Sequence, residues 1–296
     1  MSIQALKKQS SVEKLKKAIE QSQAGNGQKF ASEDTRFWTP DVDKAGNGYA
    51  IIRFLDTPEI DGEDSLPWVQ LWSHSFQGPG GWYIENSLTT IGQNDPVGEY
   101  NTKLWNSGVE SNKKIARDQK RKLNYISNIL VISDPKHPEN EGKVFLYKYG
   151  KKIFEKIKEK FEPQFEDEKP MYAFDLWNGA NFKLKIRQVD GYRNYDKSEF
   201  EDQSPVAKDD NAIAAIWKLE HSLKEFVKPE KFKSYEDLQK RLNKALGNTE
   251  VPVSNASPAN SAVSNTTKPK PTAETAGSTD DDDDLAFFEK MVSDNN

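Results

Sequence analysis

The chain has 296 residues and no cysteine, and its 42 Lys and Arg against 47 Asp and Glu give a formal net charge of −5. The lack of cysteine excludes disulfides, thiolate zinc sites and cysteine nucleophiles. No stretch approaches about 18 apolar residues, and the lysine-rich start has no apolar signal region, so we expect a soluble, unsecreted protein of one large or two small domains.

The first 24 residues are a basic arm with five lysines and two glutamates. Ser10 and Glu13 have capping-box spacing, and Val12, Leu15 and Ile19 share one helical face. This pattern predicts a short basic amphipathic helix. The alternative is an ordinary solvated surface helix.

Strands dominate the region from about residue 28 to residue 200. We predict them over residues 49–55, 68–72, 82–85, 125–132, 144–149 and 182–187. The last strand alternates apolar residues with Lys183, Lys185 and Arg187, which predicts three cations on one face. One helix follows Gly150. Short strands with irregular connections favour a small barrel over an α/β sheet.

Two further helices are predicted near the end of the core. One spans residues 211–226, and the other begins at Ser234, has Asp237 three residues on and stops at Gly247. From Val251 the sequence becomes a Ser, Thr, Asn, Pro and Ala linker that is too polar to bury a core. We therefore divide the chain into an arm (1–24), a core (25–248) and a disordered linker with an acidic tail (249–296).

The charge of the chain is unevenly distributed. From Val251 onward three lysines face eight acidic residues, whereas residues 113–122 hold six Lys or Arg against one Asp. Residues 143–160 hold seven Lys against two Glu. An acidic tail on a body with basic, aromatic-rich segments is typical of a protein that binds a polyanion and carries an anionic competitor.

Three clusters combine cations with tyrosines. They are Lys120-Arg121-Lys122 with Tyr125, the segment 143–152 with Tyr147 and Lys148, and Tyr192-Arg193-Asn194-Tyr195. Cations contact phosphates and aromatic rings stack on unpaired bases, which indicates single-stranded nucleic acid. The alternative is that the basic residues form solvated edges and the tyrosines belong to the core.

Other classes of function lack support in the sequence. No basic recognition helix for duplex DNA is evident, since the only basic helices predicted are the arm and the helix after Gly150. The three histidines, His74, His137 and His221, are scattered, and no H-E-x-x-H, P-loop or G-x-S-x-G motif occurs. We therefore predict that the chain is not an enzyme.

Several stretches between residues 30 and 245 occur together in a fixed order. They are residues 45–48 running into 52–55, then 82–85, 120–122, 128–131, 134–145, 150–153, 179–182, 188–196 and 231–234, of which the block 134–153 is the most specific. In these stretches the chain resembles the single-stranded DNA-binding, helix-destabilising protein of T-even-like phages.

The resemblance implies an OB-fold core, a small Greek-key β-barrel that is mainly β with insertions and packed C-terminal helices. Together with the clusters above, it gives the following DNA-binding residues: Arg53, Tyr100, Lys120, Arg121, Lys122, Tyr125, Tyr147, Lys148, Tyr192, Arg193 and Tyr195. Two aromatic positions of the family fall at Ile126 and near Ala116. With fewer stacking platforms, we expect weaker contact per nucleotide.

The family also binds one zinc ion through a histidine and three cysteines. His74 matches the histidine, but Ser87, Asp95 and Gly98 stand at the cysteine positions. One imidazole and one carboxylate cannot close a tetrahedral site. We therefore expect no metal and no cofactor, and we expect apolar packing to hold residues 88–98.

The resemblance further implies roles for both ends of the chain. Lys7, Lys8, Ser10 and Ser11 would drive head-to-tail self-association on DNA. The tail residues Asp280, Asp281, Asp282, Asp283, Asp284, Leu285, Phe287 and Phe288 would bind replication and recombination proteins. The protein would then coat single strands cooperatively during phage DNA replication, recombination and repair, in the cytoplasm of the infected bacterial host. Two alternatives stay open: a regulator that binds single-stranded RNA, and an interaction scaffold whose barrel is structural.

Overall fold

The computed structural model describes residues 34–62 and 64–248. The chain divides into two compact units, residues 1–38 and 39–296. Only residues 34–38 of the first unit are described, and there Arg36 forms an ion pair with Asp34 at 2.6 Å. The predicted arm (1–24) and the predicted tail (249–296) lie outside the described residues.

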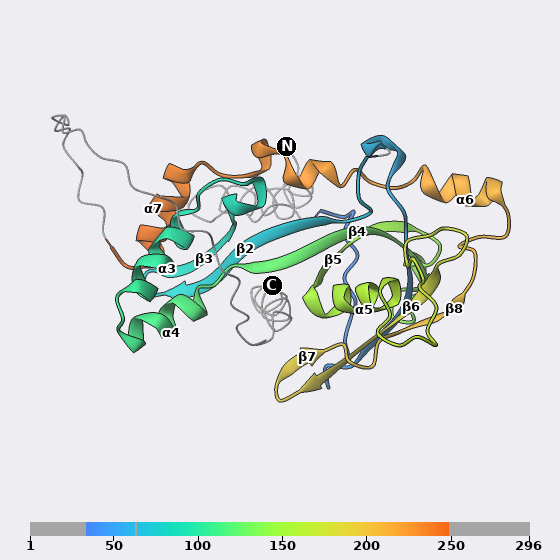
Figure 1. Cartoon of the computed structure of the whole chain (residues 1–296), viewed down its shortest axis with the longest axis horizontal. Helices are drawn as coiled ribbons and strands as arrows, with labels where there is room; N and C mark the ends of the chain where they lie inside the picture. The colour runs from blue at the N-terminus through green and yellow to red at the C-terminus, as the bar shows by residue number, and fades with distance from the viewer. Residues whose placement is uncertain (1–33, 63, 249–296) are drawn as a thin grey trace, which may run out of the picture. The chain divides into compact units, whose positions relative to one another are not determined.

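The second unit is a mixed α/β structure built on an open, antiparallel sheet (Figure 1). Its strands are β1 (Gly48–Phe54), β2 (Val69–Gly78), β3 (Gly81–Asn86), β4 (Lys122–Ser133), β5 (Val144–Gly150), β6 (Ala180–Val189), β7 (Tyr192–Asn194) and β8 (Glu199–Gln203). Their order is β3-β2-β4-β1-β6-β7, with β5 also paired to β4 and β8 to β6. The six predicted strands are confirmed, and β7 and β8 are additional.

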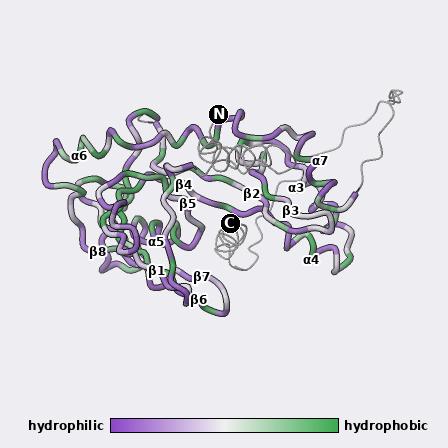
Figure 2. The backbone as a smooth tube through the Cα atoms, turned by 180° about the vertical axis from the view of Figure 1, so that it is seen from behind, coloured by the Kyte–Doolittle hydropathy of each residue, from purple (hydrophilic) through white to green (hydrophobic). Residues whose placement is uncertain are grey.

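Strand β4 is the centre of the sheet. Its first half pairs with β2 and its second half with β1, while β5 runs along its other edge. Residues 124–131 are all buried, because this strand is covered on both faces. Figure 2 shows green hydrophobic positions interleaved with purple ones where these strands lie side by side.

Five α-helices occur in the described part of the chain: α3 (Pro96–Asn106), α4 (Glu110–Asp118), α5 (Lys151–Phe161), α6 (Asp210–Trp217) and α7 (Tyr235–Ala245). The helix after Gly150 is confirmed as α5. The helix capped by Ser234 is confirmed as α7, where the Ser234 hydroxyl accepts a hydrogen bond from the Asp237 amide. None of these helices is long and apolar enough to cross a membrane.

Helices α3, α4 and α7 gather around the β2–β3 hairpin, whereas α5 packs on β4 and β5 (Figure 1). Phe76, Tyr83 and Val97 form a buried apolar cluster with Leu238 and Leu242 of α7. The close approach of hairpin and helix requires glycine, since a Cβ on Gly80 would overlap the Lys244 carbonyl oxygen. This packing fixes the hairpin beside the start of β4.

The alternation predicted for residues 182–187 is confirmed. Phe182, Leu184 and Ile186 are buried, and the cations between them face outward. Each cation is ion-paired: Lys183 with Glu201 at 3.1 Å, Lys185 with Glu199 at 2.7 Å and Arg187 with Asp196 at 2.6 Å. This face of β6 is therefore a ladder of opposite charges and not a free basic surface.

Candidate nucleic-acid interface

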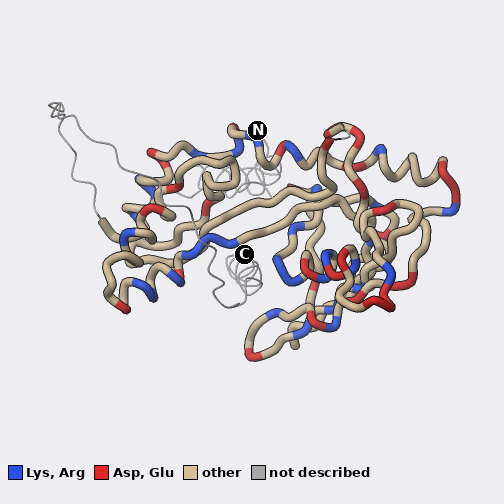
Figure 3. Tube along the Cα trace, viewed as in Figure 1, with Lys and Arg blue, Asp and Glu red and all other residues tan. Residues whose placement is uncertain are grey.

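The basic triplet lies at the start of β4, where helix α4 ends. Lys120 and Arg121 are exposed and Lys122 is half-buried, and Figure 3 shows the run of blue that they form. The Arg121 guanidinium lies over the ring of Trp72 on β2, with its Cζ 4.2 Å from the ring centroid. A guanidinium held on an indole face is fixed in place while its edge N–H groups stay available to phosphate oxygens.

A second aromatic–cation group lies on α3 and α4. Trp105 is 48% exposed, and the Arg117 Cζ and the Lys113 Nζ lie 5.3 Å and 5.8 Å from the centroid of its ring. Glu110 accepts a hydrogen bond from Arg117 at 3.0 Å, and this contact lowers the pKa of the Glu110 carboxyl. The group thus presents an exposed indole between two cations that are partly balanced by one carboxylate.

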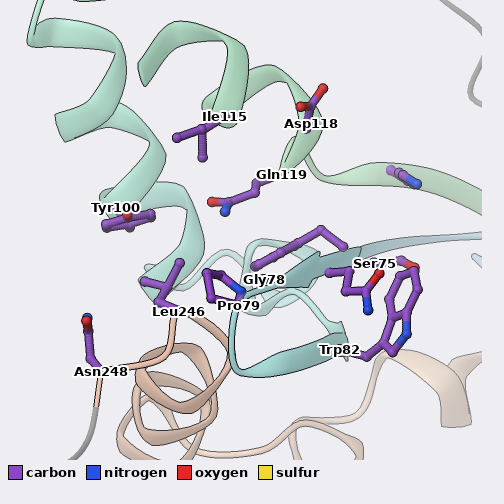
Figure 4. Close-up of a pocket in the computed structure, with 13 residues that line it drawn as sticks. Ser75, Gly78, Pro79, Trp82, Tyr100, Ile115, Asp118, Gln119, Leu246 and Asn248 are labelled. Atoms are coloured by element: carbon purple, nitrogen blue, oxygen red, sulfur yellow. The ribbon is translucent and has the colours of Figure 1, made fainter. Parts of the chain in front are cut away.

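A cavity of about 570 Å³ opens beside the triplet. Tyr100 of α3 and Ile115 of α4 line its helical side, Trp82 of β3 lines its hairpin side, and Lys122 also contributes (Figure 4). Asn248, the last described residue, lies at this cavity as well. An aromatic-lined cavity with an ammonium group has the chemistry to hold a flat base with its phosphate nearby.

The tyrosines of the central strands are buried. Tyr125 and Tyr147 are 5% and 3% exposed. The Tyr125 ring stacks on Phe154 at 3.9 Å and on Tyr149 at 5.8 Å, and Tyr147 stacks on Tyr149 at 5.4 Å. Burial raises the pKa of the Tyr125 phenol. In this arrangement the rings stack on one another, and their contact with DNA stays a prediction.

The third predicted cluster lies on the β6–β7 hairpin. Tyr192 is 54% exposed, Arg193 is half-buried and Tyr195 is only 4% exposed. The turn uses Asp190 and Gly191, both with positive φ, to reverse the chain. Within the hairpin, β7 pairs antiparallel with β6. Of this cluster, therefore, only the Tyr192 ring is widely open to a ligand.

Arg53 is fully enclosed, and Lys148 is half-buried. Arg53 is 0% exposed, and its Nη2 donates to the carbonyl oxygens of Asp175 at 2.7 Å and Ser204 at 2.9 Å. Burial lowers the pKa of Arg53 to about 10, against the opposing effect of the Asp175 charge. Burial also lowers the pKa of the half-buried Lys148. In the structure Arg53 ties β1 to two loops, and its role in DNA binding stays a prediction.

The positions that match a zinc site hold a buried polar network. The His74 Nε2 lies 3.2 Å from the Asp95 Oδ1, and the His74 Nδ1 lies 3.0 Å from the Gln119 carbonyl oxygen. The Asp95 carboxylate accepts hydrogen bonds from the Ser87 hydroxyl and from the amides of Leu88, Val97 and Gly98. Burial opposes ionisation, but the contacts with His74 and the hydrogen bonds from Leu88 and Ser87 lower the pKa of Asp95.

These residues do not fit a tetrahedral zinc site. Both Asp95 oxygens are already occupied by hydrogen-bond donors, Ser87 is one of those donors, and Gly98 has no side chain. Within the described ranges no group of three His, Asp or Glu side chains is placed to hold a metal ion. Leu88 and Val97 pack in the apolar cluster, and Asp95 adds buried hydrogen bonds that the expectation of apolar packing did not include.

Sequence reasoning missed three residues of this surface. Trp72, Trp82 and Trp105 lie beside Arg121, Lys122 and the Lys113–Arg117 pair. The sequence does place tryptophans in predicted strands and near the basic segment. The helices that carry Trp105 and Arg117 were not predicted, however, so their approach was not visible. The arm residues Lys7, Lys8, Ser10 and Ser11, and the tail from Asp280 to Phe288, lie outside the described residues.

Comparison with known proteins places the chain in a family. Residues 46–246 match the family model described as gp32 DNA binding protein like. The chain is 41% identical over 229 residues to the single-stranded DNA-binding protein of Enterobacteria phage T2, covering 76% of this chain and 74% of the relative. Its identity to the protein of the same name from Enterobacteria phage T4 is 40% over 228 residues, covering 75% and 74%. The chain belongs to the gp32-like family of DNA-binding proteins.

Proposed function

We propose that the chain binds single-stranded DNA on the surface formed by α3, α4 and the start of β4. The observation that carries this proposal is the exposed pair Lys120 and Arg121, with Arg121 fixed on Trp72 and the aromatic cavity of Trp82 and Tyr100 beside them. The relatives from phages T2 and T4 carry the name single-stranded DNA-binding protein, which supports the same ligand.

The chemistry of this surface suits an unpaired strand. Every linkage of the strand has a negative charge for the cations, and every base has a face that can stack on an indole or phenol ring. Both kinds of contact tolerate any sequence. We therefore propose binding with little sequence preference and with an affinity that falls steeply as salt rises, because binding releases counterions.

The relatives are named as binding proteins and not as enzymes, and this confirms the prediction that the chain is not an enzyme. We further propose that the chain coats strands cooperatively during phage DNA replication, recombination and repair inside an infected bacterial cell. The basic arm would join neighbouring copies, and the acidic tail would compete with DNA and recruit other proteins. An OB-fold is also proposed, supported by the antiparallel pairing of the central strand β4 with β1, β2 and β5.

We propose that the protein works without zinc. The network of His74, Asp95 and Ser87 takes the place of metal coordination between β2 and α3. Metal analysis of the purified full chain tests this directly. Stoichiometric zinc, or a melting temperature that falls on addition of a chelator, would contradict it.

The decisive experiment compares a triple variant with a charge-matched control. The triple variant of the full chain removes three cations from the surface: Lys120→Ala, Arg121→Ala and Lys122→Ala. The control variant removes three exposed cations elsewhere: Lys44→Ala, Lys208→Ala and Lys218→Ala. Binding to poly-dT is followed by tryptophan fluorescence at several salt concentrations. For a single strand the slope of log K against log salt is roughly −0.7 per phosphate contact, so the triple variant should lose about 2 units of slope.

The control variant should keep the wild-type slope. Equal slopes for the wild type and the triple variant would contradict this interface. Duplex DNA and a matched RNA oligomer, titrated in the same way, distinguish the ligand classes. Tighter binding to RNA would favour the RNA-binding alternative.

A further inference from the structure

A second cavity, of about 630 Å³, lies between the loop after β1, the loop before β6 and helix α6. Its floor is apolar and includes Leu176, Ile213 and Trp217, while Asp56, Glu59 and Asp210 stand on its rim. None of the described residues that line it is a lysine, an arginine or a histidine. It is thus an apolar cavity with an acidic rim, and its volume is in the usual range for sites that bind small molecules.

Hydrogen bonds hold the two tryptophans of this cavity in place. The Trp217 Nε1 donates to the Thr57 carbonyl oxygen at 2.8 Å, and the Trp177 Nε1 donates to the Asp210 carboxylate at 2.8 Å. Trp177 is nevertheless 51% exposed. Both indoles are therefore fixed before any ligand binds, and the Trp177 ring stays open to one.

The carboxylates of the rim carry uncompensated charge. Among the described residues, no lysine or arginine forms an ion pair with Asp56, Glu59 or Asp210. Burial and the neighbouring Asp175 charge raise the pKa of Asp56. The Arg53 guanidinium, whose charge acts on Asp175, is fully enclosed and does not line the cavity. A cationic ligand would relieve the repulsion among these carboxylates, whereas a polyanion would be repelled.

The cavity is separate from the candidate nucleic-acid interface. Helix α6 lies at the opposite end of the sheet from α3 and α4 (Figure 1). No described residue lines both this cavity and the cavity beside the basic triplet. A ligand bound here would therefore occupy a site of its own.

We propose that this cavity binds an aliphatic polyamine, a small molecule in which methylene chains separate ammonium groups. The methylenes would lie on the apolar floor, as lysine stems lie on apolar surfaces, and the ammonium groups would reach the carboxylates of the rim. One ammonium group would also lie over the open Trp177 ring in a cation–π contact.

Other cations fit this cavity less well. In the part of the chain that the structure describes, no three His, Asp or Glu side chains are placed together to hold a metal ion. A lysine side chain of another protein would bring one ammonium group to three carboxylates. A polyamine brings several, at spacings that leave apolar methylenes between them, and so matches both the rim and the floor.

The test is a calorimetric titration of the full chain with spermidine in the absence of DNA. The rim variant, with Asp56→Asn, Glu59→Gln and Asp210→Asn, removes the three charges and keeps amide oxygens where Asp56 and Asp210 accept hydrogen bonds. The control variant, with Glu166→Gln, Asp167→Asn and Glu168→Gln, removes three exposed carboxylates that do not line the cavity. Both variants have the same net charge and keep the acidic residues 280–284, so nonspecific attraction of a cation is equal in both.

The wild type and the control variant should bind one spermidine per chain, and the rim variant should bind it at least about tenfold more weakly. Glu59→Gln alone changes an exposed side chain and should weaken binding about threefold, as for the loss of one partly screened charge pair. Equal affinities of the rim variant and the control variant for spermidine would overturn the inference.

Two further titrations separate a polyamine site from simpler explanations. Mg²⁺ has the charge of 1,4-diaminobutane without its methylenes, so the diamine should displace spermidine at least about tenfold more effectively than Mg²⁺ does. Equal displacement by both would reduce the site to a general attraction for cations and overturn the inference. Tighter binding of an end-blocked trilysine peptide than of spermidine would also overturn it, in favour of a segment of another protein. Because no DNA is present, failure of these titrations would leave the proposed function untouched.

Discussion

Glu220 is a buried carboxyl without a partner among the described residues, since neither of its oxygens has a hydrogen-bond donor there. Its pKa is raised to about 9 by burial and then by the charges of Asp56 and Asp61. Ionisation is thus disfavoured in the folded state only. The contribution of Glu220 to the free energy of unfolding is therefore most favourable below the ordinary glutamate pKa of about 4.3. It becomes less favourable as the pH rises from there to about 9.

Glu220→Gln should therefore stabilise the protein increasingly as the solution becomes alkaline. At pH 8 we expect a gain of about 1 kcal/mol or more in the free energy of unfolding, and near pH 4 a difference close to zero. Urea unfolding of both proteins at a series of pH values measures this. The exposed Glu230→Gln serves as control, and a gain that does not grow with pH would contradict the assignment.

Single residues also show how much of the candidate interface can be predicted from the sequence. Lys120 and Arg121 are exposed as the basic triplet predicted. Tyr125 was predicted to bind DNA because it lies beside the basic triplet, and Tyr147 because it shares a strand face with Phe145 and Tyr149; both rings are buried in the structure, and their contact with DNA stays a prediction. Periodicity shows that two rings share a face, and it does not show whether another element covers that face. Here Phe154 of α5 covers the Tyr125 ring.

At the level of elements, the turn between β2 and β3 fixes the position of α7. The Gly80 amide donates to the Ala245 carbonyl oxygen at 2.8 Å, and a Cβ on Gly80 would overlap the Lys244 carbonyl oxygen. Gly80→Ala should cost about 1–3 kcal/mol of unfolding free energy, because the helix end must move away. It should also weaken binding to DNA, since Leu246 and Asn248 line the aromatic cavity.

Thermal unfolding and titration with poly-dT measure both effects of Gly80→Ala, and Gly98→Ala is the matched control. Its Cβ would meet only the Asp95 Cβ at 3.9 Å, and Gly98 has an ordinary φ inside α3. Alanine favours helix over glycine by up to about 1 kcal/mol. The control should therefore be neutral or stabilising, and equal losses in both variants would refute the steric argument.

The elements that sequence reasoning missed have little apolar periodicity. Helix α4 buries only Ala116, and α3 buries only its first two residues, Pro96 and Val97. The predicted helix 211–226 ends early, at Trp217, for a tertiary reason. Asn128 donates to the His221 carbonyl oxygen and accepts from its amide, both at 2.9 Å, and so takes the backbone groups that a longer helix would use. Such long-range partners are not visible in a local pattern.

For the whole molecule, the balance of charge is the property with a consequence for binding. Residues 251–296 carry the entire net charge of −5, and the rest of the chain is neutral overall. Truncation after residue 250 should raise the affinity for a short oligothymidylate, most strongly at low salt, because the anionic competitor is gone. Titrations at two salt concentrations test this. If the full and truncated chains had identical affinities at both salt concentrations, competition by the tail would be ruled out.

The location of Asn248 determines how such competition would respond to dilution. This residue lines the aromatic cavity, so all that follows it in sequence is covalently anchored at the edge of the proposed binding surface. An attached competitor keeps the same local concentration however dilute the protein becomes, whereas encounters with DNA become rarer. Ionic strength, and not the amount of protein, would then determine how often the surface is open.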